Sequence, residues 1–244
     1  MHRRLAMFAF LAVAVAAAAC NGGDGGSDRA TGRRADQARQ AAAEAGLDDD
    51  VQEILALAAS GLDATYQVTF ETTGEGEGES AQLVVSQRPP DRRLDLIGAD
   101  GATATSLFVD DAAYQCSKPA DGEWECVATA ADTGSSAPGV FDEDTLASTI
   151  AELAASRTVY DFSVERRQVA GVDASCLVTE LRPGREPIEG QGESGTLCFS
   201  GEGAIVVVEQ PGERAAASAY TTDLPADLFN LPARPSAATT TSPG

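Results

Sequence analysis

Apolar and polar residues alternate along most of the chain after Thr65. Tyr66, Val68 and Phe70 alternate with polar neighbours, and the same period of two returns at residues 160–164. Such alternation is typical of strands with one buried face, and the segments rich in Gly and Pro between them are typical of short turns. The pattern therefore predicts roughly ten strands joined as an antiparallel meander.

Two other stretches repeat apolar residues every three or four positions, which is the spacing of one helix face. They are residues 51–62, which follow the triplet Asp48-Asp49-Asp50, and residues 141–157. Residues 34–45 are rich in Ala, Gln and Glu and predict a more polar helix. Because carboxylates stabilise the positive end of a helix, the Asp triplet predicts a helix start and not a calcium site.

These elements predict an α+β fold in which a single strongly curved antiparallel sheet, a half-barrel, has helices packed on one face. We assign residues 34–232 to one domain. Residues 20–33, rich in Gly, Asp and Ser, are expected to form a flexible tether, and residues 233–244 a disordered tail.

The first 20 residues have the features of an export signal. Arg3 and Arg4 precede an uncharged apolar run that is too short for a spanning helix, so residues 1–19 are expected to be a signal peptide. The ending Ala17-Ala18-Ala19-Cys20 resembles the bacterial lipoprotein signal, which implies that Cys20 becomes the first residue and carries acyl chains such as palmitate. The alternative is cleavage at an ordinary signal peptidase site. Lipidation would anchor the protein to the outer face of the cell membrane.

Charge excludes two classes of partner. The formal net charge is −21, and removal of Arg3 and Arg4 with the signal would lower it to −23. So negative a chain is repelled by anionic lipid headgroups and by nucleic acid phosphates. We therefore expect no nucleic acid partner, and a membrane attachment that depends on acyl chains instead of surface charge.

The residues needed for common catalytic chemistry are missing. The one histidine, His2, lies in the expected signal peptide, and Lys118 is the one lysine. Without a histidine base, nucleophilic catalysis by serine has few routes, and no phosphate-binding or dinucleotide-binding motif is present. The sequence predicts a protein that is not an enzyme and has no cofactor.

Four cysteines remain after Cys20. They bracket two segments rich in turn residues, which favours disulfides joining Cys116 to Cys126 and Cys176 to Cys198 within hairpins. The other two connectivities stay open. A zinc site is disfavoured because the cysteines lack paired CxxC spacing and no histidine accompanies them, so we expect no metal.

Several segments resemble the LolA-like superfamily, in particular its actinobacterial lipoprotein branch of the LppX and LprG type. Besides the lipidated start and the internal helix, the resemblance rests on short stretches spread over residues 45–232, namely Tyr66–Glu71, Pro90–Leu96, Leu107–Asp111 and Tyr220–Pro232. It implies an open half-barrel closed by helices around an apolar cavity that shelters acyl chains. The family has no catalytic residues to transfer.

The alternating apolar residues are the candidate lining of that cavity. They are Tyr66, Val68, Phe70, Leu83, Val85, Leu94, Leu96, Tyr160, Phe162 and Val164. A packed core would give the same pattern, so two functions stay open. The first is a membrane-anchored protein that binds a lipid or another apolar ligand for carriage or presentation in the cell envelope. The second is an accessory lipoprotein with a filled core that binds an unidentified protein of an envelope complex or sensor system.

Overall fold

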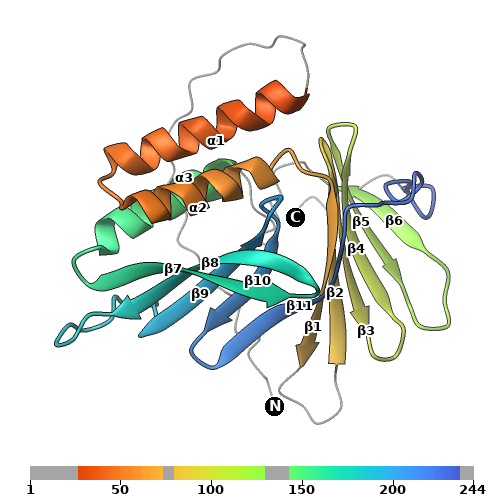
Figure 1. Ribbon diagram of the computed structural model, residues 1–244. Helices are drawn as coiled ribbons and strands as arrows, with labels where there is room; N and C mark the ends of the chain where they lie inside the picture. The colour runs from red at the N-terminus through yellow and green to blue at the C-terminus, as the bar shows by residue number, and fades with distance from the viewer. Residues whose placement is uncertain (1–26, 74–79, 130–142, 237–244) are drawn as a thin grey trace, which may run out of the picture.

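The structure, a computed structural model, describes residues 27–73, 80–129 and 143–236. Within these ranges it has three helices and one open antiparallel sheet of eleven strands, in the order β6-β5-β4-β3-β2-β1-β11-β10-β9-β8-β7. The predicted α+β class, with a single curved sheet and helices on one face, is confirmed (Figure 1). None of the described helices combines the length and apolar character of a membrane span.

The strands follow the predicted alternation closely. Their bounds are β1 Tyr66–Thr73, β2 Ser80–Arg88, β3 Asp91–Gly98, β4 Thr103–Val109, β5 Ala112–Lys118, β6 Glu125–Thr129, β7 Tyr160–Val169, β8 Val172–Leu181, β9 Ser194–Ser200, β10 Ile205–Gln210 and β11 Glu213–Thr221. Each strand pairs with a neighbour in an antiparallel register. The sheet is a meander apart from the β1–β11 pairing, which joins its two halves.

The three helices are α1 Ser27–Glu44, α2 Asp49–Gly61 and α3 Glu143–Ser156. Helix α2 begins after Asp48, as the acidic triplet predicted, and buries Val51, Ile54 and Leu55. Helix α1 differs from the prediction because it starts at Ser27, inside the segment expected to be a flexible tether.

Helix α1 is held on the outer side of α2 and α3 (Figure 1). Its buried residues are the small Ala38 and Ala42. Three ion pairs supplement this contact: Arg34 Nη1 lies 2.7 Å from Asp63 Oδ1, Arg34 Nε lies 3.0 Å from Glu143 Oε1 on α3, and Arg39 Nε lies 2.8 Å from Glu53 Oε1. The apolar contact of α1 is therefore modest, and its position depends partly on charge.

The two halves of the sheet are covered differently. In Figure 1 the helices lie over the half formed by β7–β11, whereas β3–β6 extend steeply to one side. Helix α2 contacts β7, β8 and β9. We refer to β3–β6, residues Asp91–Thr129, as the wing. We call the face of the wing that carries Leu94 and Leu96 its inner face. The helices do not extend over all of this face.

The β7–β11 half is strongly curled. Arg167 on β7 and Glu209 on β10 form an ion pair of 3.1 Å across the two strands that separate them, and β7 also contacts β11. Register places both residues on the face that carries Cys176 and Cys198. A flat sheet would hold β7 and β11, four positions apart, at about 19 Å, so the contact between them requires this half to curl.

A close backbone contact joins α2 to the sheet. A Cβ atom added to Gly61, the last residue of α2, would collide with the carbonyl oxygen of Gly203 in the β9–β10 turn. One added to Gly203, whose φ is +85°, would collide with the carbonyl oxygen of Leu57. Both positions therefore require glycine, and the helix end sits directly on the turn.

The buried Gln87 side chain completes this junction. Its amide nitrogen lies 2.7, 3.2 and 3.0 Å from the carbonyl oxygens of Gly61, Leu62 and Ala64. Carbonyls at a helix C-terminus have no partner within the helix and are costly to bury alone. Strand β2 thus supplies the cap that lets α2 end against the sheet.

The C-terminal segment, residues 222–236, crosses the face of the wing that points away from the helices. Arg88 and Arg93 donate hydrogen bonds to the carbonyls of Pro225 and Leu228, at 2.9 and 2.8 Å, and Phe229 is buried with its ring centre 5.1 Å from the Arg88 guanidinium. The Ser236 backbone amide donates to the Cys126 carbonyl at 2.9 Å. Ordered structure thus continues beyond the boundary predicted at residue 232.

We predict that Gly203→Ala lowers the free energy of unfolding by about 3 kcal/mol or more, because it combines a left-handed backbone with a steric collision. Gly171→Ala is the matched control. Gly171 also has a positive φ, of +81°, but a Cβ there meets nothing within 4 Å, so a loss of about 1–2 kcal/mol is expected. Urea denaturation of both variants measures the difference. Equal losses would contradict the contact.

Candidate functional site

Both disulfides join directly paired strands, as predicted. Cys116 pairs with Cys126 across β5 and β6, and Cys176 pairs with Cys198 across β8 and β9, with Cα–Cα distances of 4.1 and 3.9 Å. Disulfides persist in oxidising compartments, so the pair fits an exported protein. Cys20, the predicted lipidation site, lies outside the described residues.

The structure gathers most of the candidate lining residues into one apolar core. Tyr66, Val68, Phe70 and Val85 are buried in it, and Leu83, Phe162 and Val164 pack against it. The helices contribute to the same core, with residues that include Ile54, Leu55, Leu146, Ile150 and Leu153. Helix side chains therefore occupy the space next to the candidate lining.

Three candidate lining residues lie outside this core. Tyr160 is buried at the start of β7, where its hydroxyl donates to the Gly192 carbonyl at 3.0 Å. Leu94 and Leu96 lie on β3, where helix coverage ends. Leu94 is buried, whereas half of Leu96 is exposed.

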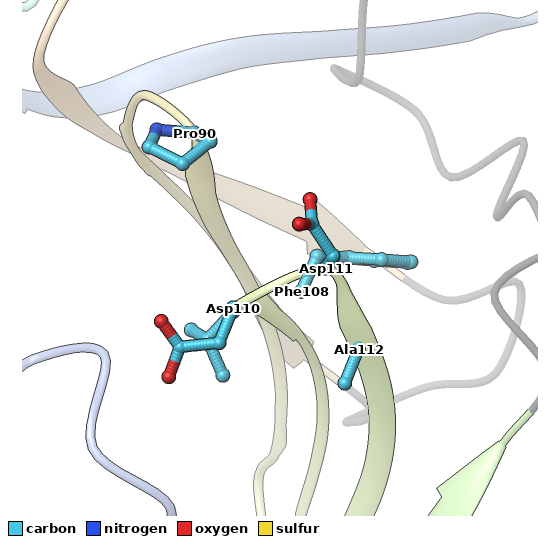
Figure 2. A pocket seen from close by; sticks show the side chains of 6 residues that line it. Pro90, Phe108, Asp110, Asp111 and Ala112 are labelled. Carbon is cyan, nitrogen blue, oxygen red and sulfur yellow. The ribbon is translucent and has the colours of Figure 1, made fainter.

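Two hollows among the described residues lie at strand ends, away from the candidate lining. One, of about 260 Å³, is lined by Pro90 and residues 108–112 (Figure 2). The other, of about 410 Å³, is lined by residues 180–185 with Glu193 and Ser194. Neither hollow is lined by any of the candidate lining residues.

The first hollow carries two neighbouring carboxylates, Asp110 and Asp111, which form the β4–β5 turn. Figure 2 shows their carboxylates pointing in different directions. Within the described ranges, no group of three or more His, Cys, Asp or Glu side chains is arranged to hold a metal ion. These two residues are therefore best explained as turn residues.

Much of the inner face of the wing is open to solvent, although Leu94 and Ala113 on it are buried. One row across the sheet runs Val85, Leu94, Ser106, Gln115, Val127, and the next runs Leu83, Leu96, Ala104, Ser117, Glu125. From β4 onward most inward side chains are small or polar, apart from Phe108, and the Gln115 amide donates to the Ser106 hydroxyl at 2.9 Å. Leu96 and Val127 are nevertheless 50% and 41% exposed.

Sequence reasoning selected Leu94 and Leu96 on this face but none of the inward residues of β4–β6. Its strands were predicted, but their inward residues are mixed in polarity and resemble an ordinary solvated surface. The available signal was the change from apolar to small inward residues after Leu96, together with Val127 isolated on the edge strand. The signal can be interpreted only when the strand register shows that these residues share one face.

No family model and no curated protein matches the chain. Among solved structures it is similar to a chain in the complex of MucA and MucB from Pseudomonas aeruginosa, with 18% identity and a TM-score of 0.40, covering 68% of this chain and 54% of that one. A crystal structure of MucB in complex with MucA(peri) gives the same identity and TM-score, with 67% and 52% covered. The chain thus spans about half the length of the structures it matches. Neither structure establishes what this chain binds.

Tyr66 gives the core a measurable pH dependence. Burial raises the pKa of its phenol to about 12, and the positive charge of Arg92 opposes this shift. Because the folded state holds the proton more tightly, the stabilisation is complete below pH 10 and is lost as the pH rises from about 10 through about 12.

We predict that Tyr66→Phe removes about 2 kcal/mol of this alkaline loss. The measurement is urea denaturation of the wild type and the variant at pH 7, 10 and 12. The difference at pH 7 serves as the internal reference for loss of the hydroxyl itself. Parallel stability curves for the two proteins would contradict a buried, titrating phenol.

Proposed function

We propose that the protein is an exported, membrane-anchored binding protein without catalytic activity, and that a protein partner binds the open face of the wing. The contrast between the two halves of the sheet supports this proposal most directly. The helices fill the core over the β7–β11 half, whereas the wing leaves Leu96 and Val127 exposed on a stable sheet. This corresponds to the accessory lipoprotein with a filled core.

The proposed anchor is supported by the sequence and by charge. A protein this acidic needs covalent acyl chains to stay at a membrane, and two or three chains hold far more firmly than one. Six residues separate Cys20 from the start of α1, a span of at most about 20 Å when extended. The domain would then be held close to the membrane surface.

The proposal of a binding role agrees with the polar chemistry of the described residues. Lys118, the one lysine, lies at the end of β5 on the face of the wing that carries the Cys116–Cys126 disulfide. Most arginines are engaged by carboxylates or by backbone carbonyls. A constellation of nucleophile, base and orienting group, which hydrolytic catalysis requires, is therefore not supported.

Carriage of a lipid or another apolar ligand is the second candidate. It is favoured by the resemblance to the LolA-like superfamily and by one observation, that Leu94 and Leu96 extend the apolar face beyond the helices. An acyl chain that entered the core would have to displace side chains such as Leu55 and Ile150. The structure of the core therefore supports a protein partner more strongly.

We predict that Cys20→Ser prevents acylation and moves the protein from the membrane fraction to the soluble exported fraction. Cell fractionation with immunodetection measures this, and loss of metabolic labelling by a palmitate analogue confirms the cause. Because the substitution changes none of the described residues, the thermal stability of the released protein should be unchanged. Membrane association that persists in the variant would overturn the anchor.

Native mass spectrometry after mild purification separates the two candidate functions. We expect the protein to carry no lipid, since packed side chains occupy the helix-covered core. A stoichiometric lipid adduct that disappears when Leu55→Trp fills the core further would favour carriage. An adduct unaffected by that change would indicate that the lipid binds outside the helix-covered core.

A further inference from the structure

The structure assigns the open face of the wing to a cationic amphipathic helix of the partner, a conclusion that rests on the proposed binding function and specifies its ligand. Three large hydrophobic residues are exposed in the described part of the chain: Leu96, Val127 and Ile188. Leu96 and Val127 lie on the same face of the wing, whereas Ile188 lies in the β8–β9 connection. The wing thus concentrates the exposed apolar surface.

The dimensions of this face suit a helix. Leu96 on β3 and Val127 on β6 are separated by three strand spacings, about 14 Å. The residues between them on β4 and β5 include the small Ala104, Ser106 and Ser117, with Gln115 directly beside Val127. A helix with its side chains is about 10–12 Å across, so it can lie along the strands between the two larger residues.

Charge around this face selects a basic partner. Six exposed carboxylates lie at the two ends of the wing strands: Asp100, Asp121, Glu123 and Glu125 at one end, and Asp110 and Asp111 at the other. Within the described ranges, none of the six forms an ion pair. Arg92 is the one basic residue on the inner face, so the local charge is clearly negative. An acidic rim around apolar residues complements a helix with Lys or Arg beside its apolar stripe.

The wing is suited to present this face because its opposite face is occupied. The C-terminal segment and the Cys116–Cys126 disulfide both lie on that opposite face. The bond from Ser236 to the Cys126 carbonyl also takes up part of the outer edge of β6. A partner is thereby directed to the inner face and not to the sheet edge.

The test uses a synthetic helical peptide of about 18 residues with Leu at positions i, i+3, i+4 and i+7 and Lys elsewhere. Fluorescence anisotropy at low and high salt measures its binding to the full exported domain. We expect Leu96→Asp and Val127→Asp to weaken binding at least about tenfold each. Ile188→Asp, which places the same charge at the third exposed hydrophobic residue, should change binding less than about twofold.

Two further measurements separate the apolar and electrostatic parts of the interaction. The double variant Glu123→Gln/Glu125→Gln should weaken binding and flatten its salt dependence. A peptide with Glu in place of Lys, or with Ser in place of Leu, should bind at least about tenfold more weakly. Amide chemical shifts of the labelled protein map the peptide independently if a variant at Leu96 or Val127 fails to fold.

Several outcomes would overturn the assignment. They are equal losses in Val127→Asp and Ile188→Asp, equal binding of the peptide that lacks Leu, and chemical shift changes centred on the helices. Any of these would remove the wing as the docking face while the proposed binding role survived. The binding role would fail separately if crosslinking in cells, from photoreactive residues placed over the whole described surface, captured no protein.

Discussion

The direct contact between the end of α2 and the β9–β10 turn is the constraint on which the remaining architecture depends. Two glycines, Gly61 and Gly203, allow backbone to approach backbone without side chains between them. The Gln87 amide then donates to the carbonyls of Gly61 and Ala64 at the end of this helix. Because a packed interior does not tolerate added atoms, this contact fixes the distance of α2 from the sheet and its direction. Helices α1 and α3 take their positions from α2, which both contact.

Fixing α2 over one half of the sheet makes the molecule asymmetric. The β7–β11 half curls, the Arg167–Glu209 pair spans one of its faces, and α2 contacts β7, β8 and β9. The wing lacks such a cover on its inner face. On its outer face, however, Arg88 and Arg93 hold the C-terminal segment through backbone carbonyls, and Phe229 is buried there. The buried residues of β4–β6 therefore lie mainly on the outer face of the wing, opposite to the face on which Val68, Phe70 and Val85 are buried.

This reversal explains what the sequence could predict. Alternation predicted the strands and the helix-covered core, because Val68, Phe70 and Val85 lie on a face that is buried along its length. The disulfide pairing followed from hairpin order. Alternation could not reveal that the buried face changes along the wing, where Leu107 is buried on one side and Leu96 half exposed on the other. That change depends on a segment more than a hundred residues away, which carries little periodicity of its own. The contact between Gly61 and Gly203 could not be predicted either, since both resemble ordinary glycines at the end of an element until the fold brings them together.

An exposed sheet face is useful for binding when it is rigid before the partner arrives, since a surface ordered only on binding loses affinity to the entropy of ordering. The wing meets this condition without a thick core. The Cys116–Cys126 disulfide joins β5 and β6, its two outermost strands. On the same outer face, the C-terminal segment is hydrogen-bonded to β2, β3 and β6. The buried Thr105 hydroxyl donates to Asp95, which also pairs with Arg93 at 2.8 Å. These polar and covalent links all lie on the face away from the proposed partner. They stabilise the wing while leaving its inner side chains free for contact, which a conventional two-sided core could not do.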